Sequence, residues 1–176
     1  ASRSLLGLVD DVIDVSRIEA GQLQIDARPL RLEDVVDQAV ERVRQGHGNP
    51  DVALICDWAD ASLLGARGQL HGDAQRLQQV IAHLLSHALR FTSSGQVLLH
   101  LTARADDAQG RVPLDITVQG RSVDPNTTGR LDGPPSAPAP GGKALARPRG
   151  DTGLGLDLTR RLVELMGGSL DVHSPP

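Results

Sequence analysis

The fold is decided by residues 72–92, which read GDAQRLQQVIAHLLSHALRFT. Apolar side chains recur there at intervals of three and four, namely Leu77, Val80, Ile81, Leu84, Leu85 and Ala88. This spacing gives a helix one apolar stripe, and Asp73 stands where a side chain caps a helix N-terminus. His83, His87 and Arg90 follow at spacings of four and three, so they share one edge of that helix. We expect the functional cleft along this edge.

The composition excludes several functional classes. A chain of 176 residues fits one domain with a substantial core, and that core must be aliphatic because the chain has no Tyr, one Trp and one Phe. A net charge of -4 and the lack of aromatic stacking platforms argue against nucleic-acid binding. The single cysteine, Cys56, excludes an internal disulfide framework and fits a reducing compartment.

The apolar runs do not predict a membrane segment. None approaches the ~20 residues that span a bilayer, and acidic residues interrupt the first apolar pattern too early for a signal peptide. We therefore expect a cytoplasmic fragment without membrane contact of its own. It would form part of a larger protein, membrane-anchored or not.

The first third of the chain predicts two helices with strands between and after them. Residues 4–20 carry a wide apolar stripe, which is typical of a coiled-coil or bundle helix, with an ordinary core helix as the alternative. Gly21 should end this helix, and alternating residues at 23–25 suggest a short strand. Helical spacing returns over 31–44. Strands are then predicted over 51–58 and, more weakly, over 65–71.

The part after the central helix predicts a hairpin, a loop, a helix and a last strand. Residues 96–104 and 112–118 alternate as paired strands do. Residues 120–150 are rich in Gly and Pro and should form a loop. A helix should follow, with Thr152 as its N-cap and Gly167 at its end, and then a strand over 169–173. The order of elements predicts an α+β fold with helices over one mixed sheet.

A glycine-flanked helix start could bind an anion. Gly150, Gly153 and Gly155 occur in GDTGLGLDL, where the backbone N–H groups and the helix dipole would favour a phosphate. A plain loop-to-helix junction explains the pattern equally well. The motif is neither a Walker loop nor a Rossmann turn.

His83 and His87, four residues apart, also suggest a metal site. A zinc protease needs HExxH, whereas residues 83–87 read HLLSH, and no third ligand lies nearby in the sequence. Two partly buried structural histidines are the alternative. A Ser/His/Asp catalyst has less support, because no GxSxG turn occurs.

Three segments together resemble a sensor histidine kinase of the hybrid type. Residues 5–25, LLGLVDDVIDVSRIEAGQLQI, resemble the end of its second dimerisation helix. Residues 72–92 resemble its N box, and residues 150–174, GDTGLGLDLTRRLVELMGGSLDVHS, resemble its last glycine box. The resemblance implies the α/β sandwich of the histidine-kinase and gyrase-type ATPases. It also implies a dimerisation helix at 1–21, an ATP-binding-type domain at 22–176 and a lid at 120–150.

The same resemblance implies ATP and magnesium as ligands, and the chain departs from the family where they would bind. His83 and His87 replace two asparagines, of which the second holds magnesium, so His87 is the expected metal position. An imidazole suits magnesium poorly. Arg90 keeps the family's basic charge. Gly120 stands where an Asp should accept the adenine amino group, a loss worth ~1.5–3 kcal/mol.

The last glycine box departs from the family's pattern at one position. Asp151 replaces a glycine and brings negative charge to the phosphate cradle. The remaining positions that the resemblance assigns to nucleotide binding are Gly150, Thr152, Gly153, Leu154 and Gly155.

These observations support three hypotheses. The first is a degenerate ATP-binding domain, with weak or lost nucleotide binding, that serves two-component signalling through protein contacts. The second is an active domain that phosphorylates a histidine on an upstream helix, and the third is a zinc-binding regulatory module. By resemblance, the expected partners are a second copy, bound through the N-terminal helix, and a response regulator or receiver domain; another histidine kinase is a further candidate.

Overall fold

The computed structural model describes residues 2–46, 49–59, 69–104, 110–122 and 154–172. Four helices and five strands occur in these ranges. The helices are α1 (Ser2–Glu19), α2 (Leu32–Gly46), α3 (Ala74–Phe91) and α4 (Leu154–Leu165). The strands are β1 (Arg28–Arg31), β2 (Val52–Trp58), β3 (Gln69–Gly72), β4 (Gly95–Ala103) and β5 (Leu114–Ser122). No helix in the described ranges is long and apolar enough to cross a membrane.

The main sheet is three-stranded and mixed. β4 lies in the middle, parallel to β2 and antiparallel to β5, so that Leu99 pairs with Cys56 on one side and Val118 on the other. Val97, Leu99 and Leu101 alternate along β4 and are almost wholly buried, which directs one face of the sheet onto the helices. β1 and β3 pair only with each other in the described part of the chain and form a separate two-stranded sheet.

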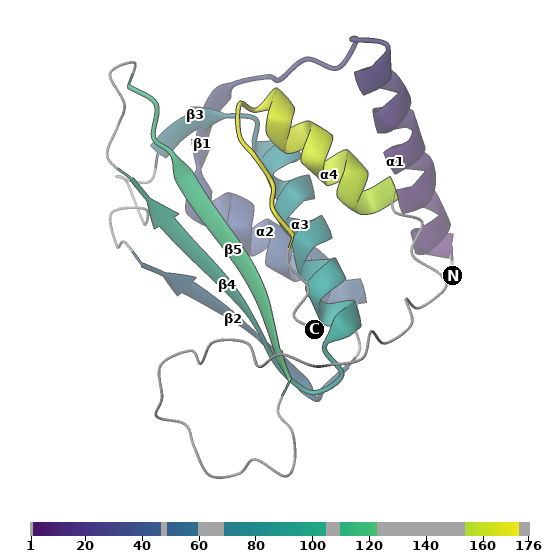
Figure 1. The fold of residues 1–176 in the computed structure, drawn as a ribbon, viewed down its shortest axis with the longest axis vertical. Helices are drawn as coiled ribbons and strands as arrows, with labels where there is room; N and C mark the ends of the chain where they lie inside the picture. Colours follow the sequence, from purple (N-terminus) through teal and green to yellow (C-terminus); the bar gives the residue numbers. More distant parts are fainter. Residues whose placement is uncertain (1, 47–48, 60–68, 105–109, 123–153, 173–176) are drawn as a thin grey trace, which may run out of the picture.

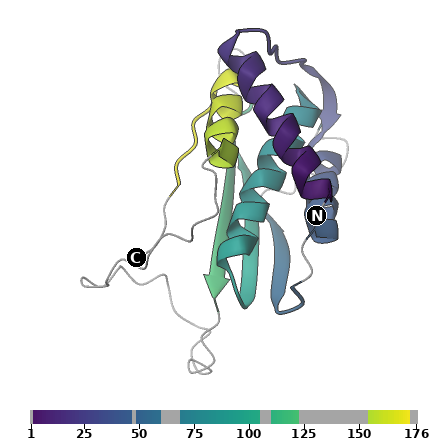
Figure 2. The same ribbon diagram turned by 90° about the vertical axis from the view of Figure 1, so that its right-hand side faces the viewer.

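α3 lies between the main sheet on one side and α1 and α4 on the other (Figures 1 and 2). It contributes to one apolar cluster on each side. The first cluster lies toward the sheet, and we call it the sheet core. It contains the buried residues Leu30, Leu32, Val35, Val36, Ala39, Val40, Val43, Ile81, Ala82, Leu85, Val97, Leu99 and Leu101. On the other side lies the α1–α4 cluster, whose buried residues are Leu23, Val80, Leu158 and Leu162, with Val15 and Ile18 of α1 packed against them.

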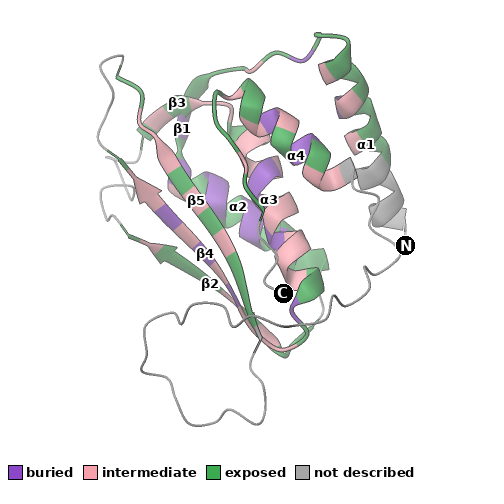
Figure 3. Cartoon of the chain, viewed as in Figure 1, coloured by how far each residue is buried: buried purple, intermediate pink, exposed green. Residues whose placement is uncertain are grey.

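α1 presents two different faces. Val15 and Ile18 face the cluster, whereas Val9, Val12 and Ile13 are 55%, 51% and 43% exposed. Figure 3 shows the exposed side of α1 on the outside of the molecule. The wide stripe predicted for this helix is therefore only partly used within one chain.

Most predicted elements are confirmed, with their ends moved by a few residues. Asp73 is the N-cap of α3 and accepts a hydrogen bond from the Arg76 N–H at 3.0 Å. Gly21 and Gly167 follow the ends of α1 and α4 with φ of 66° and 83°, which a glycine adopts without strain. The hairpin of β4 and β5 is present, and β5 runs on to Ser122, three residues into the stretch predicted as a loop.

Two predicted strands are wrong. Leu23 and Ile25 lie in an irregular connection and pack into the α1–α4 cluster, so their alternation reflects packing against helices. The first strand lies instead at Arg28–Arg31. Residues 169–172 are not a strand either, and position 173 lies outside the described ranges.

Candidate functional site

His83 lies between three helices. Its Nδ1 is 3.2 Å from Thr159 Oγ1 on α4, and its Nε2 is 3.5 Å from Asp11 Oδ1 on α1. The imidazole is 25% exposed. The edge of α3 that the sequence predicts as functional is thus covered at this position by α1 and α4.

The surroundings of His83 favour its neutral form. Burial is the main cause that lowers the pKa of His83 below its ordinary value of 6.5, and the charge of Arg42 lowers it further. Asp11 and Asp14 oppose this shift, because a carboxylate stabilises the imidazolium. Desolvation outweighs their attraction.

His87 and Arg90 occupy the next turn of the same helix. The His87 ring contacts the ring of Phe91, with centroids 4.7 Å apart and planes tilted by 58°. Phe91 is half-exposed, and Arg90 lies in the last turn of α3. His87 is therefore part of an aromatic pair at the C-terminal end of α3.

Gly120 lies on β5 against the end of α3. A Cβ placed on Gly120 would collide with the Thr92 hydroxyl oxygen and would lie 3.7 Å from the Ala88 carbonyl oxygen. Thr92 is only 4% exposed and donates a hydrogen bond to that carbonyl at 2.8 Å. The space in which an Asp side chain at position 120 would begin is filled by Thr92.

The start of α4 is held by a buried threonine. Thr159 is fully buried and donates to the Gly155 carbonyl oxygen at 2.6 Å, one turn earlier. Leu154 is the first residue of α4, and Gly155 lies in its first turn. Gly150, Asp151, Thr152 and Gly153 lie outside the described residues, as does the predicted lid beyond position 122.

The side chains at the predicted metal position do not suit magnesium. His87 offers imidazole nitrogen and packs against Phe91, whereas magnesium prefers oxygen ligands. In the described ranges, no group of three or more His, Cys, Asp or Glu side chains could hold a metal ion. The His83 nitrogens already face Thr159 and Asp11.

A buried ion pair beside His83 escaped the sequence reasoning. Arg76 Nη1 on α3 donates to Asp14 Oδ2 on α1 at 2.7 Å, and Gln79 Nε2 donates to the same oxygen at 3.0 Å. The signal was present, because Asp11, Asp14 and Ile18 recur at helical spacing beside the apolar stripe. It indicates a second contact face on α1.

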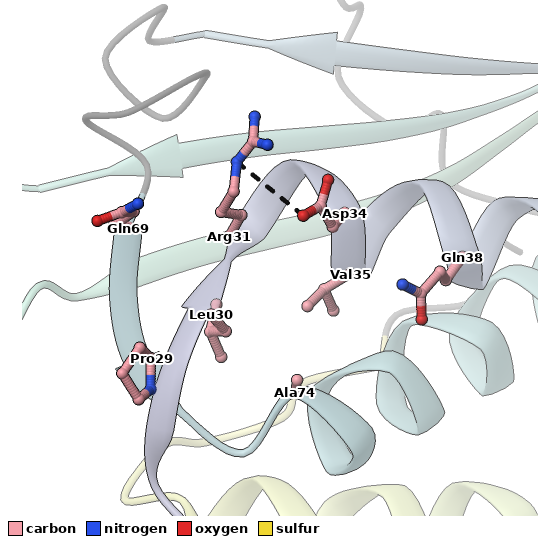
Figure 4. A pocket seen from close by; sticks show the side chains of 8 residues that line it. All are labelled: Pro29, Leu30, Arg31, Asp34, Val35, Gln38, Gln69 and Ala74. Atoms are coloured by element: carbon pink, nitrogen blue, oxygen red, sulfur yellow. Dashed lines mark ion pairs between the residues drawn. The ribbon is translucent and has the colours of Figure 1, made fainter.

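A surface pocket opens beside the start of α3. Figure 4 shows it at the junction of β1, β3 and the starts of α2 and α3. Its volume is about 360 Å³. Leu30 and Val35 form part of its wall, and an Arg31–Asp34 ion pair of 4.0 Å lies at one side. It contains none of the residues that the sequence assigns to nucleotide.

Comparisons with known proteins agree with the fold. Residues 72–176 match the family described as "Histidine kinase-, DNA gyrase B-, and HSP90-like ATPase". Along its whole length the chain is 35% identical to the virulence sensor protein BvgS of Bordetella bronchiseptica, of which it covers 14%. It is 30% identical, again along its whole length, to the signal transduction histidine-protein kinase BarA of Escherichia coli, of which it covers 18%. The chain thus spans less than a fifth of either relative.

Solved structures show the same architecture. Full-length ShkA in complex with AMPPNP matches 93% of this chain with a TM-score of 0.62 and 26% identity, over 31% of its own length. The Acinetobacter baumannii histidine kinase AdeS matches 93% of this chain with a TM-score of 0.59 and 16% identity, over 68% of its own length. Because the family match covers more than half of the chain, this protein belongs to the histidine kinase-, DNA gyrase B- and HSP90-like ATPase family, as an ATPase domain of the histidine-kinase type.

Proposed function

We propose that this domain has weak or lost nucleotide binding and serves two-component signalling through protein contacts. The observation that carries the proposal is the packing of Gly120 against Thr92. The family pattern expects a carboxylate at position 120 to accept the adenine amino group; this chain offers no side chain there, and the adjacent space is filled.

The substitution at the magnesium position supports the same proposal. His87 presents an imidazole in contact with Phe91 where the resemblance expects an amide oxygen. The sheet core is meanwhile intact and wholly aliphatic. A well-packed core together with altered ligand-binding positions supports a fold that serves another purpose.

Calorimetric titration with ATP or ADP and magnesium tests this proposal. We expect no saturable heat at micromolar nucleotide, and low-micromolar binding would contradict it. His87→Asn should not restore binding alone, because position 120 still lacks its acceptor; full recovery from this one change would also contradict it. Thermal melting of each variant in the same buffer verifies that it is folded.

A catalytically active domain is the second candidate. Arg90 in the last turn of α3 and Gly155 in the first turn of α4 are the described residues that support it, since the resemblance assigns both to phosphate contacts. Incubating a longer form of the protein, with its upstream helix, in labelled ATP would produce phosphohistidine under this candidate only. Zinc in the purified protein, measured by elemental analysis, would support the metal-binding alternative at His83 and His87.

We also infer that α1 pairs with a second copy of the chain. Val9, Val12 and Ile13 form its exposed apolar face, and such a face favours helix pairing. Sedimentation should show a dimer that Val12→Glu disrupts and that Arg17→Glu, at an exposed position to the side of this face, affects less. A monomer at all concentrations would contradict the inference. By resemblance, a response regulator or receiver domain is the other partner to test.

A further inference from the structure

The outer face of the main sheet, which points away from the helices, carries a group of polar side chains. His100 and Thr102 alternate along β4 with buried leucines, so both lie on this outer face. Asp57 of β2 lies directly beside His100 in the parallel pairing of the two strands. Three side chains with complementary hydrogen-bonding groups are thus brought together from two separate strands.

Two hydrogen bonds join these three side chains in one line. Asp57 Oδ2 is 2.7 Å from His100 Nδ1, and His100 Nε2 is 3.1 Å from Thr102 Oγ1. A carboxylate only accepts hydrogen bonds, so Nδ1 carries the proton of the neutral imidazole and Nε2 is left as an acceptor. The Thr102 hydroxyl then donates to Nε2. A hydroxyl, a base and an orienting carboxylate in this order activate a nucleophile, and such a set is recognised by its geometry.

The three side chains can be reached from solvent. The His100 and Asp57 side chains are 38% and 53% exposed, and Thr102 is half-buried. The neighbouring pair on the outer face is apolar, because Ile55 pairs with Leu98 two residues before Asp57 pairs with His100. Ile55 is 41% exposed, so an apolar group attached to a reacting carbon can lie against it.

The charges around Thr102 favour a neutral reagent over a phosphate. Asp115 of β5 lies opposite Thr102, and Asp57 lies beyond His100. Arg104 pairs with Asp115 at 3.0 Å, so this cation is already engaged. Two carboxylates repel a phosphoryl group, whose transfer needs cations placed around it, whereas the carbonyl group of an ester carries no net charge.

We propose that Thr102 is an acylation site, at which His100 and Asp57 activate the hydroxyl toward small activated carboxylic esters. Thr102 Oγ1 forms a bond to the ester carbonyl carbon while its proton passes to His100 Nε2. The bond from that carbon to the leaving oxygen then breaks, and the leaving oxygen keeps the electron pair and takes the proton from the imidazolium. The products are an O-acylated threonine and a free alcohol or phenol.

His100 is the general base in this step, and Asp57 is a positioning residue that fixes the tautomer of His100. The proposal does not depend on whether the domain binds nucleotide, because the outer face lies across the sheet from the sheet core and the helices.

Reaction with p-nitrophenyl acetate tests the proposal. In a Cys56→Ser chain, which lacks the exposed thiol, tandem mass spectrometry over time gives the rate of acetylation at each residue. We expect Thr102 to be acetylated faster than Thr117, an exposed threonine on the same face. Thr102→Ser should keep an acetylated residue at this position. Thr102→Val should lose it and leave acetylation elsewhere unchanged.

The base and the positioning residue have separate readouts. His100→Gln should slow acetylation of Thr102 about a hundredfold. Asp57→Asn should slow it about tenfold, as expected for loss of a charge-assisted hydrogen bond. Nitrogen chemical shifts from NMR should place the proton of the neutral His100 ring on Nδ1, and Asp57→Asn should weaken this preference. Asp115→Asn, which removes the same charge from the same face, is the matched control and should change neither readout as much.

Four results would overturn the proposal. They are acetylation of Thr102 no faster than that of Thr117, an unchanged rate in His100→Gln, a neutral His100 ring with its proton on Nε2, and equal effects of Asp115→Asn and Asp57→Asn. Thermal melting in the same buffer verifies that each variant is folded, so that a lost reaction reports the site and not the fold.

Discussion

The two faces of α3 pack against regions of different chemistry. Toward the sheet lies a cluster of thirteen buried residues that are all aliphatic, three of which belong to α3 itself. Toward α1 and α4 the cluster has only four buried apolar residues, one of which belongs to α3. Two of the three buried polar or charged residues in the described ranges, Asp14 and Thr159, also lie on this side. Apolar packing is non-directional and cumulative, whereas a buried ion pair depends on one geometry. We therefore expect the first region to supply most of the stability of the fold and the second to open at a lower free energy.

The largest expected effect comes from breaking the sheet core. Leu99→Ala should lower the free energy of unfolding by about 2–5 kcal/mol, because it removes a fully buried side chain from the middle strand and leaves a cavity. Urea denaturation measures the change. Leu98→Ala, next along β4 on its opposite face, is the control and should cost less. Equal losses would show that both faces of the sheet are packed alike.

A smaller loss is expected where β5 meets the end of α3. Gly120→Ala should cost about 1–3 kcal/mol, since the new methyl group displaces the Thr92 hydroxyl from its bond to Ala88. The double variant with Thr92→Ala should lose less stability than the sum of the losses in the two single variants. Strict additivity in urea denaturation would mean that the two side chains do not compete for the same space.

Loss of the N-terminal cap of α3 should lower stability by a smaller amount still. Asp73→Ala removes the acceptor of the Arg76 N–H and should lower stability by about 0.5–2 kcal/mol. Asp73→Asn keeps an oxygen acceptor and should retain most of the stability that the cap contributes. Thermal denaturation of the two variants compares them, and identical melting would contradict a role for the cap.

Acid should weaken the α1–α4 side through His83. Because burial lowers the pKa of His83 in the folded chain, the unfolded chain binds more protons between that lowered pKa and about 6.5. Stability should fall as the pH drops through this window and should be independent of His83 above it. The facing charges are Asp11, Asp14 and Arg42.

His83→Gln, which cannot titrate, isolates this effect. The difference in urea midpoint between the two chains should change with pH between neutral and mildly acidic conditions. If the urea midpoints of the two chains changed with pH in parallel, His83 would not contribute to the pH dependence of stability.

Sequence periodicity predicted the helices well, because each stripe faces one apolar cluster. α3 and its cap at Asp73 could be located directly from the spacing of its apolar residues. β1 could not, since it contains Pro29 and buries only Leu30, which leaves no alternation to detect. Leu23 and Ile25 alternate without being a strand, because a connection that packs against helices gives the same pattern.

The functional role of the candidate site residues stays a prediction, and their placement in the fold could be predicted in part. The edge of α3 with His83, His87 and Arg90 follows from residue spacing, and the family resemblance added Gly120 to it. That Gly120 packs against Thr92, or that Asp14 reaches Arg76, depends on contacts across 28 and 62 residues of chain, which one sequence does not reveal. Gly150, Asp151, Thr152 and Gly153 remain predictions.

Native-state hydrogen exchange tests the separation of the two regions most directly. We expect the amides of α2 and β4 to exchange only through global unfolding, with the urea dependence of the whole domain, and those of residues 9–19 to exchange through a local opening that depends little on urea. Equal opening free energies and equal urea dependence for α1 and β4 would contradict the account, because the α1 side would then unfold only with the sheet core.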